Sequence, residues 1–222
     1  MWQGFLWKNK ISLEVLDKLK YSMLKTVKNY DKLGSYKRSF ISMLTLSCLE
    51  YGHIISIYKM KGLLKLLPSQ GLECVSKSLL DFYSATPTKE YWGNRVKRFI
   101  AYCFPIERRY RNGSISRHFA TICILNADIF EEVFANLKDY LCPAIYGCSI
   151  FEKMYESKIH QKFPEKSLEF LSIVINNDDK FPGESLVKII KDIEAIGVEW
   201  KMNEYFLIIQ SYLVRIGMLP LS

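Results

Sequence analysis

Arginine side chains gather in the middle of the chain, at spacings that could support the binding of an anion. The stretch holds Arg95 and Arg98, then Arg108, Arg109 and Arg111 around Tyr110. Planar guanidinium groups bind phosphate or carboxylate through paired hydrogen bonds, and an aromatic ring can stack on a base. These five arginines are therefore candidate contacts for an anion or a nucleic acid. A network of arginine–carboxylate pairs with a solvated loop is the favoured alternative, since no named binding motif is present.

The same stretch begins Glu90-Tyr91-Trp92-Gly93-Asn94-Arg95. On a helix, Glu90 and Asn94 lie four residues apart, as do Tyr91 and Arg95, so each pair is expected to meet on one face. Trp92, Val96 and Phe99 are then expected to face the core.

The usual sequence signatures of catalysis and nucleotide binding are absent. The chain has no GxGxxG or GxxxxGK[ST] phosphate loop and no GxSxG nucleophile turn. The adjacent acids Glu131-Glu132 and Asp178-Asp179 would point about 100° apart on a helix, so they do not share a proton. We therefore predict no catalytic residue, no cofactor and no enzymatic activity. A small helical enzyme stays a further hypothesis, and it would need a closed polar pocket with a perturbed acid or base.

Histidine and cysteine spacing does not indicate a metal site. His53, His118 and His160 lie far apart, and a lone histidine is more often a surface or hydrogen-bonded side chain than a ligand. The cysteines form no CxxC pair, and they are Cys48, Cys74, Cys103, Cys123, Cys142 and Cys148. Their mostly apolar neighbours predict buried, reduced thiols and a cytoplasmic protein. Basic residues near Cys103 could lower the pKa of its thiol, although a core cysteine is the favoured interpretation.

The chain has 222 residues, of which 49% are hydrophobic and 24% are charged. This composition is typical of a globular protein. Disordered and collagen-like chains are excluded. No apolar run approaches the roughly 20 residues that a spanning helix needs, so we expect no membrane partner. Residues 1–117 hold 21 Lys and Arg against 8 Asp and Glu, a formal charge of +13, and the remainder carries −5. Such asymmetry can steer an anionic partner, although a solvated lysine-rich face is the favoured interpretation.

Apolar residues recur at a helical period along almost the whole chain. Roughly eleven helices are predicted, with starts near Ser69, Ser114 or Ser116, Asp128 and Asn203, and with Pro68, Pro164 and Pro182 at first helical positions. Short connections predict an all-α fold, an irregular α-solenoid or antiparallel stack of HEAT-like helix pairs. It would form a single helical-repeat domain over residues 1–222, with a weak internal break near 105–113.

Large aromatic residues open the chain, where a free terminus is usually polar. Trp2, Phe5 and Trp7 are therefore candidate contacts for a protein. Either the chain is a fragment of a longer polypeptide, or a partner covers this end.

At Trp2-Gln3-Gly4-Phe5-Leu6-Trp7 and at Glu90-Tyr91-Trp92-Gly93-Asn94-Arg95, the chain resembles an uncharacterised, all-helical C-terminal region of large bacterial proteins whose N-terminal part looks like a sirtuin-type, NAD-consuming domain. The resemblance continues through Leu67-Pro68 with Gly71-Leu72, Phe104-Pro105, and Phe163-Pro164-Glu165 with Leu168. It implies an intracellular anti-phage defence protein, in which the helical array senses or scaffolds and a separate domain consumes NAD. The glycine-rich loop and catalytic histidine of sirtuin-type domains have no counterpart here, so no catalytic residue is carried over. The chain is also rich in Lys and Ile where such arrays are often rich in Ala, Leu and Arg.

We therefore expect a non-enzymatic helical scaffold, or a regulatory or sensor region, that mediates protein interaction. Its partner would be a separate protein or a covalently attached effector domain. The alternative is a helical module that binds nucleic acid through the basic N-terminal half, and its affinity would fall steeply with salt.

Overall fold

The computed structural model of the chain describes Tyr21, Lys25, Gly34 and residues 37–50, 57–104, 112–144, 147–178 and 182–219. Every regular element in these ranges is a helix, and the number of helices agrees with the roughly eleven predicted, so the all-α class is confirmed. The finer arrangement, a HEAT-like solenoid, stays a prediction. The chain divides into two compact units, unit 1 with Met1–Leu79 and Asn94–Pro105, and unit 2 with Leu80–Gly93 and Ile106–Ser222. The predicted break near 105–113 falls mostly outside the described residues.

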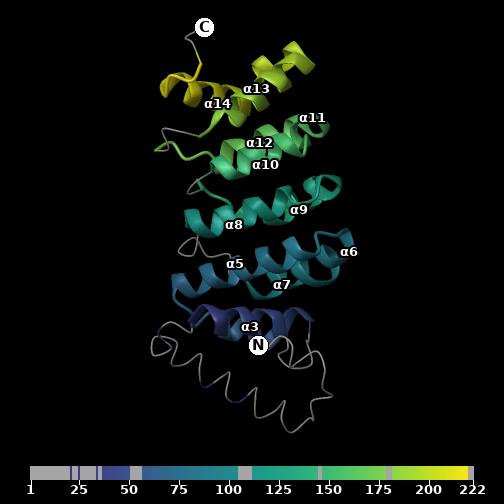
Figure 1. The fold of residues 1–222 in the computed structure, drawn as a ribbon, viewed down its shortest axis with the longest axis vertical. Coiled ribbons are helices and arrows are strands. Elements are labelled where there is room, and N and C mark those ends of the chain that lie inside the picture. Colours follow the sequence, from purple (N-terminus) through teal and green to yellow (C-terminus); the bar gives the residue numbers. More distant parts are fainter. Residues whose placement is uncertain are drawn as a thin grey trace. The chain divides into compact units, whose positions relative to one another are not determined.

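Unit 1 is built from helices drawn in the purple and blue part of Figure 1. They are α3 (Lys37–Glu50), α4 (Ile57–Leu64), the larger part of α5 (Ser69–Ala85), the end of the π-helix η2 (Trp92–Val96) and α7 (Lys97–Cys103). Helix α4 packs against α7, and both bury their apolar faces. Fully or almost fully buried side chains such as Leu44, Leu64 and Phe99 make the core.

Unit 2 contains the end of α5 and the remaining helices. They are α6 (Lys89–Tyr91), α8 (Gly113–Ile124), η4 (Ala127–Ile129), α9 (Phe130–Leu137), η5 (Lys138–Tyr140), α10 (Cys148–Glu156), α11 (Ile159–Lys162), α12 (Pro164–Val174), α13 (Glu184–Ile196), η6 (Val198–Met202) and α14 (Glu204–Arg215). Helix α8 packs with α9 and α10, α10 with α13, and α12 with α14, so that these helices follow one another in layers (Figure 1). Phe170 meets Phe130 and Phe134 edge-on, with centroid distances of 5.8 and 5.6 Å.

Asparagine side chains begin several helices of unit 2. Asn203 caps α14 at the predicted start by accepting hydrogen bonds from the backbone of Tyr205 and Phe206. The predicted caps of two other helices are wrong. Asn112 and not Ser114 or Ser116 caps α8, and Asp128 does not cap α9, because it lies inside the short helix η4, which Asn126 caps directly before α9. Asparagine is both a turn former and a strong N-cap, so its amide oxygen takes the cap where the turn meets the helix.

Three prolines and Ser116 were also predicted at the starts of helices, and the structure places some of them elsewhere. Of the three prolines predicted at first helical positions, Pro164 occupies one, whereas Pro68 and Pro182 lie just before α5 and α13. Ser116 is buried, and its hydroxyl joins α8 to the segment after η5 by donating to the Cys142 carbonyl and accepting from the Cys142 amide. Of the helices in the described ranges, none combines enough length with enough apolar character to cross a lipid bilayer.

Candidate anion-binding site

Two of the five candidate arginines lie in the described part of the chain. Arg95 is at the end of the π-helix η2 and Arg98 is in the first turn of α7, and both side chains are exposed. The other candidates, Arg108, Arg109 and Arg111, lie outside the described residues, as do the candidate protein contacts Trp2, Phe5 and Trp7. The site that can be built from structure is therefore the one around Arg95 and Arg98.

The helical segment carrying these arginines is held by its apolar residues. Trp92, Val96 and Phe99 are buried as predicted, with exposed fractions of 0, 0 and 1%. The residues between them are left at the surface, which places Asn94, Arg95 and Arg98 in solvent. The π-helix was not predicted, and its i→i+5 hydrogen bonding differs from the 3.6-residue turn assumed for the pairs around Tyr91 and Arg95. Single-turn π-helices occur frequently at functional sites.

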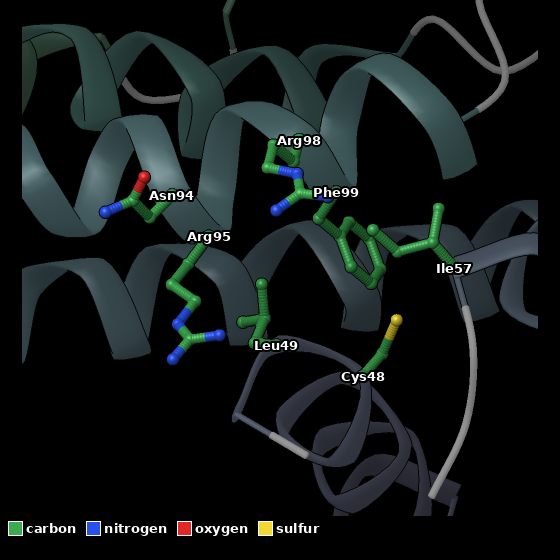
Figure 2. A pocket seen from close by; sticks show the side chains of 7 residues that line it. All are labelled: Cys48, Leu49, Ile57, Asn94, Arg95, Arg98 and Phe99. Atoms are coloured by element: carbon green, nitrogen blue, oxygen red, sulfur yellow. The ribbon is translucent and has the colours of Figure 1, made fainter. Parts of the chain in front are cut away.

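A partly open cavity of about 270 Å³ lies in unit 1 beside Arg95 and Arg98. Its lining residues are Cys48, Leu49, Ile57, Asn94, Arg95, Arg98 and Phe99. Figure 2 shows the polar side chains projecting from the η2–α7 segment, with Leu49 and Cys48 of α3 below them and Ile57 at the start of α4. The cavity therefore has an apolar floor and a cationic rim.

Neither Arg95 nor Arg98 forms an ion pair or side-chain hydrogen bond with any other described residue. Unit 1 as a whole holds 16 Lys and Arg against 5 Asp and Glu, a formal charge of +11. Two guanidinium groups at the rim of an open cavity give it the chemistry that suits an anionic ligand. The arginine–carboxylate network favoured by the sequence does not form at Arg95 and Arg98 among the described residues.

A second cavity, of about 400 Å³, lies in unit 2 beside α14. Its arginine, Arg215, donates to the Asn177 carbonyl and side-chain oxygens at 3.1 and 2.9 Å and lies over the Tyr212 ring. Because Arg215 already has these partners, it is less available to a ligand than Arg95 or Arg98. The exposed apolar residues Leu207 and Ile208 complete the edge of this cavity.

Cys48 and Cys103 are both buried in unit 1. Cys103, the last residue of α7, donates a hydrogen bond to the Ile57 carbonyl oxygen at 3.2 Å. The hydrogen bond from Cys103 lowers the pKa of the Cys48 thiol against the opposing effect of burial, while the same bond and burial raise the pKa of Cys103. The hypothesis that Cys103 has a lowered pKa is therefore wrong, and its interpretation as a core cysteine is confirmed. Spacing in the sequence gave no sign of this pair.

All six cysteines are free thiols, with Cys48, Cys103 and Cys123 buried and the other three half-buried. His160 is fully buried, and its Nε2 lies 3.0 Å from the Asp192 carboxylate, so it is a hydrogen-bonded core histidine. His53 lies outside the described residues. Within the described ranges, no three His, Cys, Asp or Glu side chains gather in a way that could hold a metal ion.

No family model, no curated protein and no solved structure matches the chain.

Proposed function

We propose that the chain is a non-enzymatic helical scaffold that binds an acidic segment of a partner protein at the cavity beside Arg95 and Arg98. The observation that carries the proposal is the combination of an apolar floor with two exposed arginines that have no partner in the described part of the chain. Guanidinium groups bind carboxylates through paired hydrogen bonds. An aspartate or glutamate would meet the rim, and an adjacent apolar side chain would cover Ile57, the half-buried apolar residue of the cavity lining.

The size of the cavity supports a peptide ligand. At about 270 Å³ it lies just below the roughly 300–1,000 Å³ of most small-molecule sites, so it has room for a few side chains. Single-stranded nucleic acid is bound by stacking bases on exposed aromatic rings. The one ring in this cavity, Phe99, is 1% exposed, which favours an acidic peptide over a nucleic acid.

The proposed setting is the cytoplasm, which the free cysteines support because reducing compartments keep thiols unpaired. The partner would be a separate protein or an effector domain on the same polypeptide. The second possibility is what the resemblance to helical arms of sirtuin-like defence proteins implies.

A selection of random displayed peptides on the full chain tests the proposal. The recovered peptides should combine Asp or Glu with Leu, Ile or Phe. They should bind the double variant R95E/R98E at least about tenfold more weakly, since a like charge then faces the carboxylate. A matched control is R38E/K65E, which makes the same change of net charge at two exposed cations, Arg38 in α3 and Lys65 just after α4. Neither has an ion-pair partner among the described residues, and neither lines the cavity.

Recovered peptides without an acidic residue would contradict the proposal, as would equal weakening in both double variants, which would leave only net charge as the cause. A labelled oligodeoxythymidine tests the nucleic-acid alternative in parallel. Binding that falls steeply with salt and is lost in R95E/R98E would replace the acidic peptide by a phosphate backbone as ligand.

A further inference from the structure

The cavity of about 400 Å³ in unit 2 takes most of its lining from one face of α14. Leu207, Ser211 and Arg215 follow one another at intervals of four residues, and Ile208 lies beside the first of them. Side chains four residues apart lie on the same face of a helix. Since a helix rises 1.5 Å per residue, the row from Leu207 to Arg215 is about 12 Å long. Along this row the lining changes from aliphatic to hydroxyl to guanidinium.

The guanidinium group at one end of the row is held in a fixed position. Nη2 of Arg215 donates to the backbone and side-chain oxygens of Asn177 at 3.1 and 2.9 Å, and the guanidinium carbon lies 5.7 Å from the centre of the Tyr212 ring. Nε and Nη1 have no acceptor among the described residues, and neither does the exposed hydroxyl of Ser211. Arg215 therefore offers a ligand fewer N–H groups than a free arginine, but it offers them from a position that is already ordered.

The other end of the row is apolar and accessible. Leu207 and Ile208 are 45 and 53% exposed, whereas Phe206 and Ile209 are 1 and 0% exposed and make the buried side of the same helix. The packing of α14 against α12 thus leaves both aliphatic side chains in solvent. The described lining of the cavity includes one cation and no acid. Because unit 2 as a whole carries a formal charge of −3, an anion would be held here by direct contact with the guanidinium group.

We propose that this cavity binds a small molecule with a carboxylate at one end and an aliphatic tail at the other. The carboxylate accepts hydrogen bonds from Arg215 and from the Ser211 hydroxyl, and the tail lies along α14 and covers Leu207 and Ile208. At about 400 Å³ the cavity falls within the roughly 300–1,000 Å³ of small-molecule sites. The site belongs to a different unit and takes a different class of ligand from the acidic-peptide site beside Arg95.

Titration calorimetry of the full chain with sodium decanoate, below its micelle-forming concentration, tests the inference. The extended chain of decanoate is comparable in length to the row on α14. One molecule should bind per chain, and decanol, which has the same tail without the carboxylate, should bind at least about tenfold more weakly. This comparison uses the parent chain, so it needs no variant to fold. Absent binding of decanoate, or equal binding of the two compounds, overturns the inference.

Variants of each end of the row test where the acid binds. R215Q removes the charge and L207Q/I208Q removes the aliphatic wall, so each should weaken decanoate binding at least about tenfold. The matched controls are K191Q, which removes an exposed cation of α13, and M202Q, which removes an exposed apolar side chain of η6, because neither residue lines the cavity. Equal weakening in the controls overturns the assigned site.

Two further outcomes separate this inference from its alternatives. Decanoate binding that is lost in R95E/R98E and complete in R215Q would place the acid in unit 1 and overturn the site on α14. An N-acetylated Ala-Leu-Leu peptide with a free C-terminal carboxylate tests a chain end as ligand. Tighter binding of this peptide than of decanoate, lost when its carboxylate is amidated, would overturn the small molecule in favour of a peptide C-terminus. None of these titrations requires the partner of the acidic-peptide proposal, so either proposal can fail alone.

Discussion

The two units use their charged side chains in different ways. Unit 2 holds 15 Lys and Arg against 18 Asp and Glu, a formal charge of −3 against +11 for unit 1. In unit 2, Lys138 and Lys166 both pair with the buried Glu169, and further pairs join other helices. In unit 1, Arg95 and Arg98 have no such partner among the described residues. Charges in unit 2 therefore contribute to the structure, whereas these arginines remain available for binding.

The thiols show the same contrast. Cys123 of unit 2 is surrounded by the core, and burial raises the pKa of its thiol, which makes it unreactive. Cys48 of unit 1 is also buried, yet a hydrogen bond from Cys103 lowers its pKa. Burial therefore does not by itself set the direction of a cysteine pKa, since a hydrogen bond from Cys103 opposes it at Cys48.

Glu169→Gln should give the largest loss of stability among the substitutions considered for this comparison. Burial raises the pKa of Glu169, but hydrogen bonds from Lys138 and Lys166 outweigh burial and leave the pKa below its usual value. Removing the carboxylate leaves two lysines without their partner, and we expect the free energy of unfolding at pH 7 to fall by about 1–3 kcal/mol. Urea denaturation followed by circular dichroism measures it. Glu165→Gln, an exposed acid on the same helix, should have little effect.

The ion pairs of Glu169 with Lys138 and Lys166 also predict how the stability of the chain depends on pH. Because the folded pKa of Glu169 lies below its unfolded value of about 4.3, the stabilisation is present above that pH and is lost as pH falls through the folded value. Glu169→Gln should therefore lose less stability than the parent chain between pH 7 and pH 3. Asp192, whose pKa is lowered by its hydrogen bond to His160, supplies part of the remaining acid sensitivity. Parallel pH profiles of the two proteins would show that the carboxylate does not stabilise unit 2.

The sequence was sufficient for the fold class and for much of the core. Burial of Trp92, Val96 and Phe99 followed from their spacing, because apolar residues three and four positions apart share a helix face. The π-helix at Trp92–Val96 could not be predicted, since the same apolar pattern is compatible with an α-helix and with a π-helix. Local patterns give the buried side of a helix but not a single widened turn.

The site was only half predictable. Arg95 and Arg98 were found by residue type, because arginine is suited to carboxylates and phosphates. Their unpaired state and the apolar floor depend on α3, α4 and α7 coming together, which no local spacing contains. Cys48 and Cys103 are far apart in the sequence and belong to different helices, so their common place in unit 1 depends on tertiary structure.

Unit 2 also contains a position that opposes its stability. Lys158, between α10 and α11, has a left-handed backbone with φ of 55°, which costs a residue with a Cβ roughly 1–2 kcal/mol. Lys158→Gly should raise the free energy of unfolding by about 0.5–1 kcal/mol, after the greater freedom of glycine in the unfolded chain is subtracted. Thermal and urea unfolding measure the change. Lys158→Ala keeps the strained backbone while removing the charge, so an equal gain in both variants would assign the effect to the lysine side chain instead.

The smallest effect on stability is expected for substitutions of Arg95 and Arg98, the proposed binding residues of unit 1. Arg95→Ala and Arg98→Ala remove exposed side chains that have no partner among the described residues, so each should change the free energy of unfolding by no more than about 0.5 kcal/mol. The double alanine variant should nevertheless lose affinity for the selected acidic peptides, because both guanidinium groups of the rim are gone. Urea unfolding and peptide titration of the same samples measure both. A large loss of stability would mean that these arginines support the fold of unit 1, as Lys138 and Lys166 support unit 2, and the contrast between the units would disappear.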